Sequence, residues 1–237
     1  METSPSQPVY CRPQAYAAFA AQLPHIETTP GLVRAAIAIA RHERPNADPI
    51  ATEAVLDNLA DAVERRVRSQ RVEAKLAHLH DVLFDVVGLR GNVEDYYNPA
   101  DSYLPDVLRT RRGLPITLVL IYKCVGEGVG LVVHGINAPG HFLAAVEGAD
   151  SNGGASGSKL MYVDPFYGGG LLTETDAYDR IAETTGRDVP HSPKLLARAT
   201  GRQWLGRMLV NLQAVFASLG RERDLLAMQE LEALLQP

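Results

Sequence analysis

Two residues, His141 and Asp164, have the types and the surroundings expected of partners in a hydrolytic site. His141 opens a strand-like run directly after a Pro-Gly turn, and Asp164 ends the next strand-like run. Adjacent antiparallel strands would place the two side chains together, so that the carboxylate fixes the tautomer and the orientation of the imidazole. The structural alternative is a half-buried packing histidine and an aspartate that caps a turn before proline. Spacing alone favours this alternative.

The elements that must position this pair follow from hydrophobic periodicity. Apolar residues recur at helical spacing before and after the central third of the chain, which carries strand-like runs bounded by Gly, Pro or Asn. A nearly all-apolar helix should begin at Pro115, because proline is tolerated at the first helical position. The pattern predicts an α+β fold. The other predicted helices are 31–43, 50–67, 71–87, 201–219 and 221–235, and the predicted strands are 131–137, 141–147 and 160–164.

The same pattern predicts the organisation of the chain. Residues 1–30 are rich in Pro, Ser, Thr and Gln and are expected to form a flexible arm. Residues 31–192 should form the main domain, with a flexible hairpin connection at 149–159 and a loose, partly helical stretch at 173–192. Residues 193–237 should form a C-terminal helical hairpin.

Composition restricts the classes of function. Of the 237 residues, 46% are hydrophobic and 22% charged, and the net charge is −5. Lysines and arginines form no long run, which argues against nucleic acid and anionic lipid as partners. Cys11 and Cys124 suit neither a disulfide framework nor a metal site, and we recognise no targeting or membrane segment. We therefore expect a cytoplasmic protein without metal or cofactor.

Three segments, RRGLPIT, PGHF and VDPF, occur in this order and at sensible spacing. Together they make residues 31–237 resemble the SirB family of transglutaminase-like proteins. The resemblance implies a papain-type core, in which a cysteine opens the central helix and a histidine and an aspartate come from the following strands. The closing helices resemble the start of that family's tetratricopeptide-like tail, here truncated.

The resemblance also implies that the nucleophile is missing. His141 and Asp164 match the catalytic histidine and aspartate, whereas the cysteine, two residues after Gly113, falls on Pro115. Counting back from Gly130, 15 residues further on, gives the same position. Proline has no ionisable group, so acyl-enzyme chemistry through this position is excluded.

Three other residues could be considered as substitute nucleophiles. Thr117 lies about 200° further round the helix and should point elsewhere. Cys124 lies roughly 13 Å along the helix and is expected to be a buried core thiol. Nothing in the sequence favours Ser102, in the preceding loop.

A second candidate region precedes the central helix. Its polar and aromatic residues suggest either a loop that is pinned by Asx-turns, with arginines paired to nearby acids, or a groove wall for a peptide or an acidic ligand. The first interpretation is favoured. The candidate binding residues are Tyr96, Tyr97, Asn98, Arg111 and Arg112, with Asp101, Ser102 and Arg109 close by.

The other histidines give no sign of a metal site. His78 and His80 are two apart on a predicted helix and point in different directions. His134 is expected to be a packing or surface residue, and His42 should lie near a helix C-terminus, where a positive charge is favourable. The glycines at 168–170 lack the context of a phosphate loop.

We therefore expect a non-catalytic transglutaminase-like protein that binds a protein or peptide through the former active-site groove and the C-terminal helices. The alternative is a hydrolase or acyl transferase in which His141, oriented by Asp164, acts as a general base. A third possibility is a partial scaffold that needs a longer repeat array. A working base should lie within hydrogen-bond reach of Asp164 and open onto a cleft.

Overall fold

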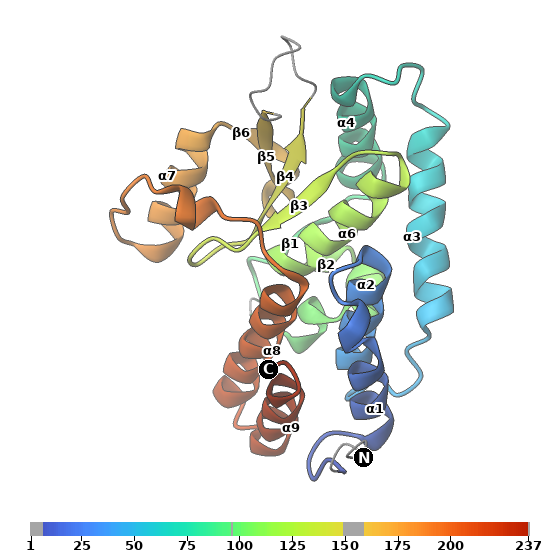
Figure 1. Cartoon of the computed structure of the whole chain (residues 1–237), viewed down its shortest axis with the longest axis vertical. Helices are drawn as coiled ribbons and strands as arrows, with labels where there is room; N and C mark the ends of the chain where they lie inside the picture. Colours follow the sequence, from blue (N-terminus) through green and yellow to red (C-terminus); the bar gives the residue numbers. More distant parts are fainter. Residues whose placement is uncertain (1–6, 96, 149–158, 237) are drawn as a thin grey trace.

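The computed structural model of the chain describes residues 7–95, 97–148 and 159–236. Helices surround a small antiparallel sheet (Figure 1), and the predicted α+β fold is confirmed. The α-helices are α1 (Pro13–Gln22), α2 (Thr29–Ala40), α3 (Pro49–Glu64), α4 (Val72–His80), α5 (Leu104–Thr110), α6 (Pro115–Gly128), α7 (Glu174–Thr185), α8 (Gly201–Ser218) and α9 (Glu222–Ala233). The strands are β1 (Arg90–Gly91), β2 (Arg112–Gly113), β3 (Val133–Ile136), β4 (Leu143–Glu147), β5 (Leu160–Asp164) and β6 (Gly170–Leu172). Short 3-10 or π turns are η1 (Leu23–His25), η2 (Asp81–Val86), η3 (Pro99–Ser102), η4 (Pro165–Tyr167) and η5 (Pro193–Leu196).

The four-stranded sheet is covered on both faces. Its strand order is β3-β4-β5-β6, with every neighbouring pair antiparallel. Side chains alternate along β4: Ala144 and Val146 join the main core with α6, whereas Leu143 and Ala145 join a smaller core with α7. This alternation is the period of two expected for a strand. Figure 1 shows α7 on the opposite side of the sheet from α3 and α4.

The central helix α6 begins at Pro115, as predicted. Leu114, with extended backbone, is the residue before its first turn, and proline occupies a position whose N–H would have no partner within the helix. Its residues from Pro115 to Tyr122 are all buried, as expected for a helix in the middle of a domain.

The N-terminal region differs from the prediction. Helix α1 begins at Pro13 and buries Ala15, Tyr16 and Phe19 against the main core, so the prediction of a flexible arm is wrong from Pro13 onward. The spacing of Tyr16 and Phe19 gives one helical face, but the Pro- and Gln-rich composition around them hides this signal. Residues 1–6 of the predicted arm lie outside the described part.

Two further elements were not predicted as such. Within the stretch expected to be loose, α7 starts at a capping box, in which Thr173 and Asp176 exchange hydrogen bonds. Before α6, the two-residue strands β1 and β2 pair in parallel, with Arg90 opposite Arg112 and Gly91 opposite Gly113. Strands this short carry no readable periodicity. The predicted hairpin connection lies outside the described residues, apart from Lys159.

The C-terminal hairpin shares the main core of the protein. Helices α8 and α9 pack on each other around Gly220, and Trp204, Met208 and Leu231 belong to the same core cluster as α2 and α6. The chain before α1 is attached to α9 as well. The backbone N–H groups of Val9, Tyr10 and Cys11 all donate to the carboxylate of Glu230, at 2.7 to 3.2 Å.

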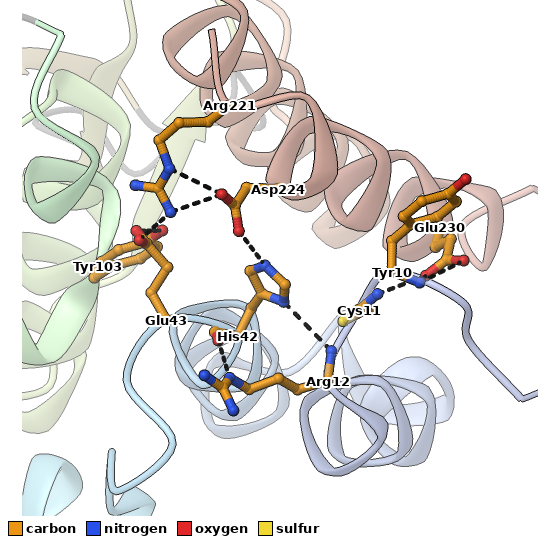
Figure 2. A network of polar contacts seen from close by, with 9 residues as sticks. All are labelled: Tyr10, Cys11, Arg12, His42, Glu43, Tyr103, Arg221, Asp224 and Glu230. Carbon is orange, nitrogen blue, oxygen red and sulfur yellow. Dashed lines mark hydrogen bonds and ion pairs between the residues drawn. The ribbon is translucent and has the colours of Figure 1, made fainter. Parts of the chain in front are cut away.

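A polar network continues from this attachment (Figure 2). His42, just after α2, accepts from the backbone N–H of Arg12 and contacts Asp224 of α9 through Nε2, at 2.9 Å. Arg221 donates to Asp224 and to Glu43, and Glu43 also accepts the hydroxyl proton of Tyr103. Chain segments separated by up to 221 residues are thereby joined. We define these residues as the His42 network: Val9, Tyr10, Cys11, Arg12, His42, Glu43, Tyr103, Arg221, Asp224 and Glu230.

Candidate functional site

His141 and Asp164 are in direct contact. Nε2 of His141 lies 3.0 Å from each carboxylate oxygen of Asp164, and the two side chains are only 4% and 1% exposed. His141 comes from the turn before β4 and Asp164 from the end of β5, so neighbouring antiparallel strands bring them together, as predicted. Asp164 occupies Nε2, which leaves Nδ1 as the ring nitrogen for any proton transfer.

Asp164 has two further partners that hold it in place. Its side chain accepts the backbone N–H of Phe166 at 3.2 Å, and Nε of Arg180 lies 3.3 Å from its second oxygen. The guanidinium of Arg180 also lies over the ring of Tyr167, 4.2 Å from the centroid. Arg180 lies in α7, within a stretch predicted to be mostly loose, so the sequence interpretation missed it. Its contact with Asp164 supplies the positive charge that a buried carboxylate requires.

The imidazole of His141 is covered rather than open. The Phe166 ring packs edge-on to it at a centroid distance of 5.9 Å, and the Tyr167 ring lies tilted at 6.1 Å. The structure therefore meets the first requirement of a working base, contact with Asp164. A ring that is 4% exposed leaves little room for a substrate atom at Nδ1.

The start of α6 is connected to this pair through Phe166. Gly91 of β1 lies so close to the Phe166 ring that a β-carbon there would approach to 2.4 Å, which only glycine avoids. Strand β1 pairs with β2, and β2 leads through Leu114 into Pro115. Pro115 is thus the first residue of a buried helix at the position where the resemblance expects a cysteine, and its ring carries no nucleophile.

The substitute nucleophiles are poorly placed. Thr117 is fully buried, and its hydroxyl faces the carbonyl of Ser102 at 3.5 Å. The hydroxyl of Ser102 is itself buried and has no hydrogen-bond partner among the described residues, so solvent does not reach it in this structure.

Neither cysteine is a suitable nucleophile. Cys124 is half-buried rather than enclosed in the core as predicted, because a cavity between α2 and α3 reaches it. Burial and nearby acids raise the pKa of its thiol to about 11. Burial and Glu230 raise the pKa of Cys11 to about 12, so both thiols are protonated at neutral pH.

The predicted binding residues surround the segment that leads into α6. Tyr97 is exposed, and Asn98 caps η3 by accepting the N–H of Ala100. Arg111 ends α5 and Arg112 forms β2. Tyr96 lies outside the described residues. The loop was expected to contain Asx-turns, and Asn98 forms one.

Arginines and acids pair only partly in this region. Asp106 binds Arg109 and also Arg44, which lies in the turn after α2. Asp101 is buried and accepts from Asn92; burial raises its pKa and this hydrogen bond opposes the shift. Neither carboxylate binds Arg111 or Arg112.

Three of the other histidines have structural partners. His80 contacts the hydroxyl of Tyr122 at 2.9 Å, and burial lowers its pKa to about 4. His134 contacts Glu147, which Arg198 also binds. His42 follows α2 and belongs to the His42 network. Within the described ranges, no three His, Cys, Asp or Glu side chains lie close enough together to hold a metal ion.

Comparison with known proteins identifies the family. A model of the transglutaminase-like superfamily matches residues 51–210, which include the central helix, the sheet and the start of α8. The chain belongs to the transglutaminase-like superfamily.

Individual relatives extend the match. A UPF0162 protein of Xylella fastidiosa (strain 9a5c) is 32% identical over 203 residues, which cover 82% of this chain and 68% of that protein. A UPF0162 protein of Vibrio cholerae is 25% identical over 70% of this chain and 57% of its own length. The human F-box only protein 21 is 33% identical over 116 residues, 47% of this chain and 17% of that protein. No solved structure matches the chain significantly. None of the helices in the described part is both long and apolar enough to cross a bilayer.

Proposed function

We propose that this transglutaminase-like chain is a non-catalytic, SirB-type member of its superfamily that binds a protein or peptide partner. The observation that carries the proposal is proline at the first position of the central helix, beside a His-Asp pair whose imidazole is covered. Hydrolysis through a thioester needs a nucleophile, a base that can reach it and access for the substrate. In this chain proline stands at the position of the nucleophile, and the covered imidazole leaves no access for a substrate.

The retained pair then has a structural role. His141 and Asp164 tie the start of β4 to the end of β5, and Arg180 adds α7 to the same contact. The imidazole contacts a carboxylate and two aromatic rings, and these contacts stabilise the fold without requiring turnover. A former catalytic pair can be kept for this reason alone, because removing one partner would leave a buried charge.

Binding is assigned to the surface around the start of α6. This surface carries exposed side chains of the types that anchor interfaces, among them Tyr97, Tyr167 and Arg111. The hairpin of α8 and α9 is proposed as a truncated tetratricopeptide-like unit. Because several repeats are needed for a concave surface, this pair would support the fold rather than form the groove.

The alternative is a general-base enzyme, which the distance of 3.0 Å between His141 and Asp164 favours. A panel of amide and ester substrates distinguishes the two. We expect no turnover above buffer in the wild type, and none in His141→Ala or Asp164→Asn. Turnover that these substitutions abolish, in variants that keep their circular dichroism spectrum, would establish the enzyme instead.

Binding is tested by selection from a phage-displayed random peptide library. We expect enriched peptides that bind the wild type and lose affinity in Arg111→Ala/Arg112→Ala. The matched control is Arg65→Ala/Arg68→Ala, which removes two arginines beyond the end of α3 that have no ion pair in the described structure. Failure to enrich any peptide, or equal loss in the control, would contradict the proposed function.

A further inference from the structure

Three arginines gather where the chain enters the central helix. Arg90 lies in β1 and Arg112 directly opposite it in β2, and Arg111 precedes Arg112. The backbone N–H of Arg90 donates to the carbonyl of Arg111 at 3.1 Å, so the backbone of Arg111 also lies beside Arg90. Arg90 and Arg111 are exposed, and Arg112 is half-buried. Arg90 and Arg112, 22 positions apart in the chain, are thus backbone neighbours with Arg111 beside them, and the three residues are here called the arginine rim.

The rim has no internal counter-charge. In the part of the chain that the structure describes, none of the three side chains forms an ion pair or a side-chain hydrogen bond, although Glu94 and Asp95 lie in the loop after β1. The two acids of the neighbouring η3 and α5, Asp101 and Asp106, are occupied by other residues. Like charges directly opposite each other on paired strands destabilise the pairing. An anion that binds both would relieve this repulsion.

The backbone at Arg111 adds an independent observation. Arg111 has φ of +63° and is the only non-glycine residue with positive φ in the described ranges. It occupies the left-handed position that ends α5, where glycine is strongly preferred and a side chain is strained. Strain of this kind is tolerated where a side chain has a task that glycine could not perform. Here the task is to present a guanidinium beside Arg90 and Arg112.

The rim also lies next to the former active site. Gly91, the residue after Arg90, packs on the Phe166 ring, and the same ring contacts the imidazole of His141. Gly113, the residue after Arg112, leads into Pro115. A ligand held by the rim would therefore lie close to the covered His-Asp pair without entering it.

We propose that Arg90, Arg111 and Arg112 together recognise an acidic peptide segment of the partner. This inference rests on the proposed function and specifies the chemistry of the partner. The planar guanidinium fork binds a carboxylate through two parallel hydrogen bonds, and three forks suit two or three successive acidic side chains. A long polyanion is disfavoured because the whole chain carries a net charge of −5. Arg90, which the sequence interpretation did not include, becomes a binding residue.

The experiment uses the full chain and three fluorescein-labelled octapeptides: one of alternating Asp and Glu, its Asn and Gln counterpart, and a Lys counterpart. Fluorescence polarisation should show binding of the acidic peptide only, weakening as salt rises from about 0.05 to 0.5 M. Arg90→Gln should weaken binding about threefold and Arg90→Gln/Arg112→Gln about tenfold, in keeping with exposed charge pairs. Arg65→Gln/Arg68→Gln should leave it unchanged. Circular dichroism checks that each variant folds.

The outcomes separate this inference from the proposed function. Library peptides that are neutral and insensitive to Arg90→Gln would overturn the inference and leave the proposed function standing. Inorganic phosphate could also displace the labelled octapeptide at concentrations as low as those of the unlabelled acidic octapeptide. That result would overturn the inference too, because the rim would then be a simple anion site. Equal binding of the acidic peptide by the Arg65/Arg68 control and weaker binding by the Arg90 variant support it. His141-dependent turnover would reject the proposed function on its own.

Discussion

Arginine side chains have polar partners in one region of this protein and lack them in another. In the His42 network, Arg221 binds Asp224 and Glu43, and Arg12 donates to the carbonyl of His42 (Figure 2). The guanidinium of Arg221 also lies over the Phe216 ring. In the arginine rim, Arg90 and Arg112 lie opposite each other on a pair of two-residue strands, and Arg111 directly precedes the second strand. None of these three guanidinium groups has a partner in the described structure. The arginines of the first region are thus paired with acids or carbonyl groups, and those of the second are not.

The difference indicates what each region is for. Paired charges hold chain segments together, because their donors and acceptors bind one another across the fold. The Asp224 carboxyl reflects this: burial tends to raise its pKa, but hydrogen bonds from His42 and Arg221 prevail and lower it. Like charges left beside one another without counter-charges do not stabilise the fold and are available to a ligand. Changes in the network should therefore alter stability alone, and changes in the rim should alter binding.

Lowering the pH should have the largest effect on stability, because it protonates His80, which packs against Tyr122 of the central helix. Burial lowers the pKa of His80 to about 4, against about 6.5 in the unfolded chain, so the unfolded state binds the proton more readily. Stability should be complete above about pH 6.5 and fall by up to about 3 kcal/mol as the pH drops to about 4. Urea unfolding at several pH values measures this. In His80→Gln the slope over this window should flatten, and an unchanged slope would reject the assignment.

Removing the central arginine of the network should have the next largest effect. Arg221→Ala leaves Glu43, whose side chain is 14% exposed, with only the Tyr103 hydroxyl as partner. Because Arg221 itself is partly exposed, we expect a loss of about 2 kcal/mol rather than the full cost of a broken buried pair. Binding of the acidic octapeptide should not change. Arg223→Ala, on the exposed face of the same helix, is the control and should stay within about 0.5 kcal/mol.

The sequence predicted the elements that are long and periodic. Helix α6 begins at Pro115, β5 ends at Asp164 as expected, and β4 begins at Leu143, two residues after His141 rather than at it. A proline, a Pro-Gly turn and alternating apolar residues are local signals. The contact between the two side chains followed from the hairpin. That the imidazole is covered could not be predicted, since Phe166 and Tyr167 reach it through a short turn after β5.

The contacts that distinguish the two regions were not readable from the sequence. Arg90 and Arg112 are neighbours only because two-residue strands happen to pair in parallel, and such strands leave no pattern. Arg180 reaches Asp164 from a helix whose polar composition resembles a loop. The network depends on Glu230 binding the chain near Val9, 221 residues away. Local propensity carries no information about pairs this distant.

Arg111→Gly should separate stability from binding most sharply. Glycine adopts the left-handed conformation at the end of α5 without strain, so the variant should be more stable by about 0.5 to 1 kcal/mol. It also loses one guanidinium of the rim and should bind the acidic octapeptide about threefold more weakly. Arg111→Ala should weaken binding equally without the gain in stability. If Arg111→Gly gained stability and bound equally well, Arg111 would have no part in the rim.

The smallest effect is expected at the N-terminal attachment. Glu230→Gln keeps the shape of the side chain and removes the charge that three backbone N–H groups share, but Val9 and Tyr10 are exposed, so water can replace part of what is lost. We expect a loss of about 0.5 kcal/mol, near the lower limit for one ordinary hydrogen bond, because the introduced amide is partly exposed to water and still accepts from the backbone. The sharper measurement is hydrogen exchange, which should accelerate at the amides of residues 9–11 and stay unchanged at Arg90 and Arg112. Faster exchange at the β1–β2 pair as well would mean that the two regions are coupled, and the division between a holding region and a binding region would fail.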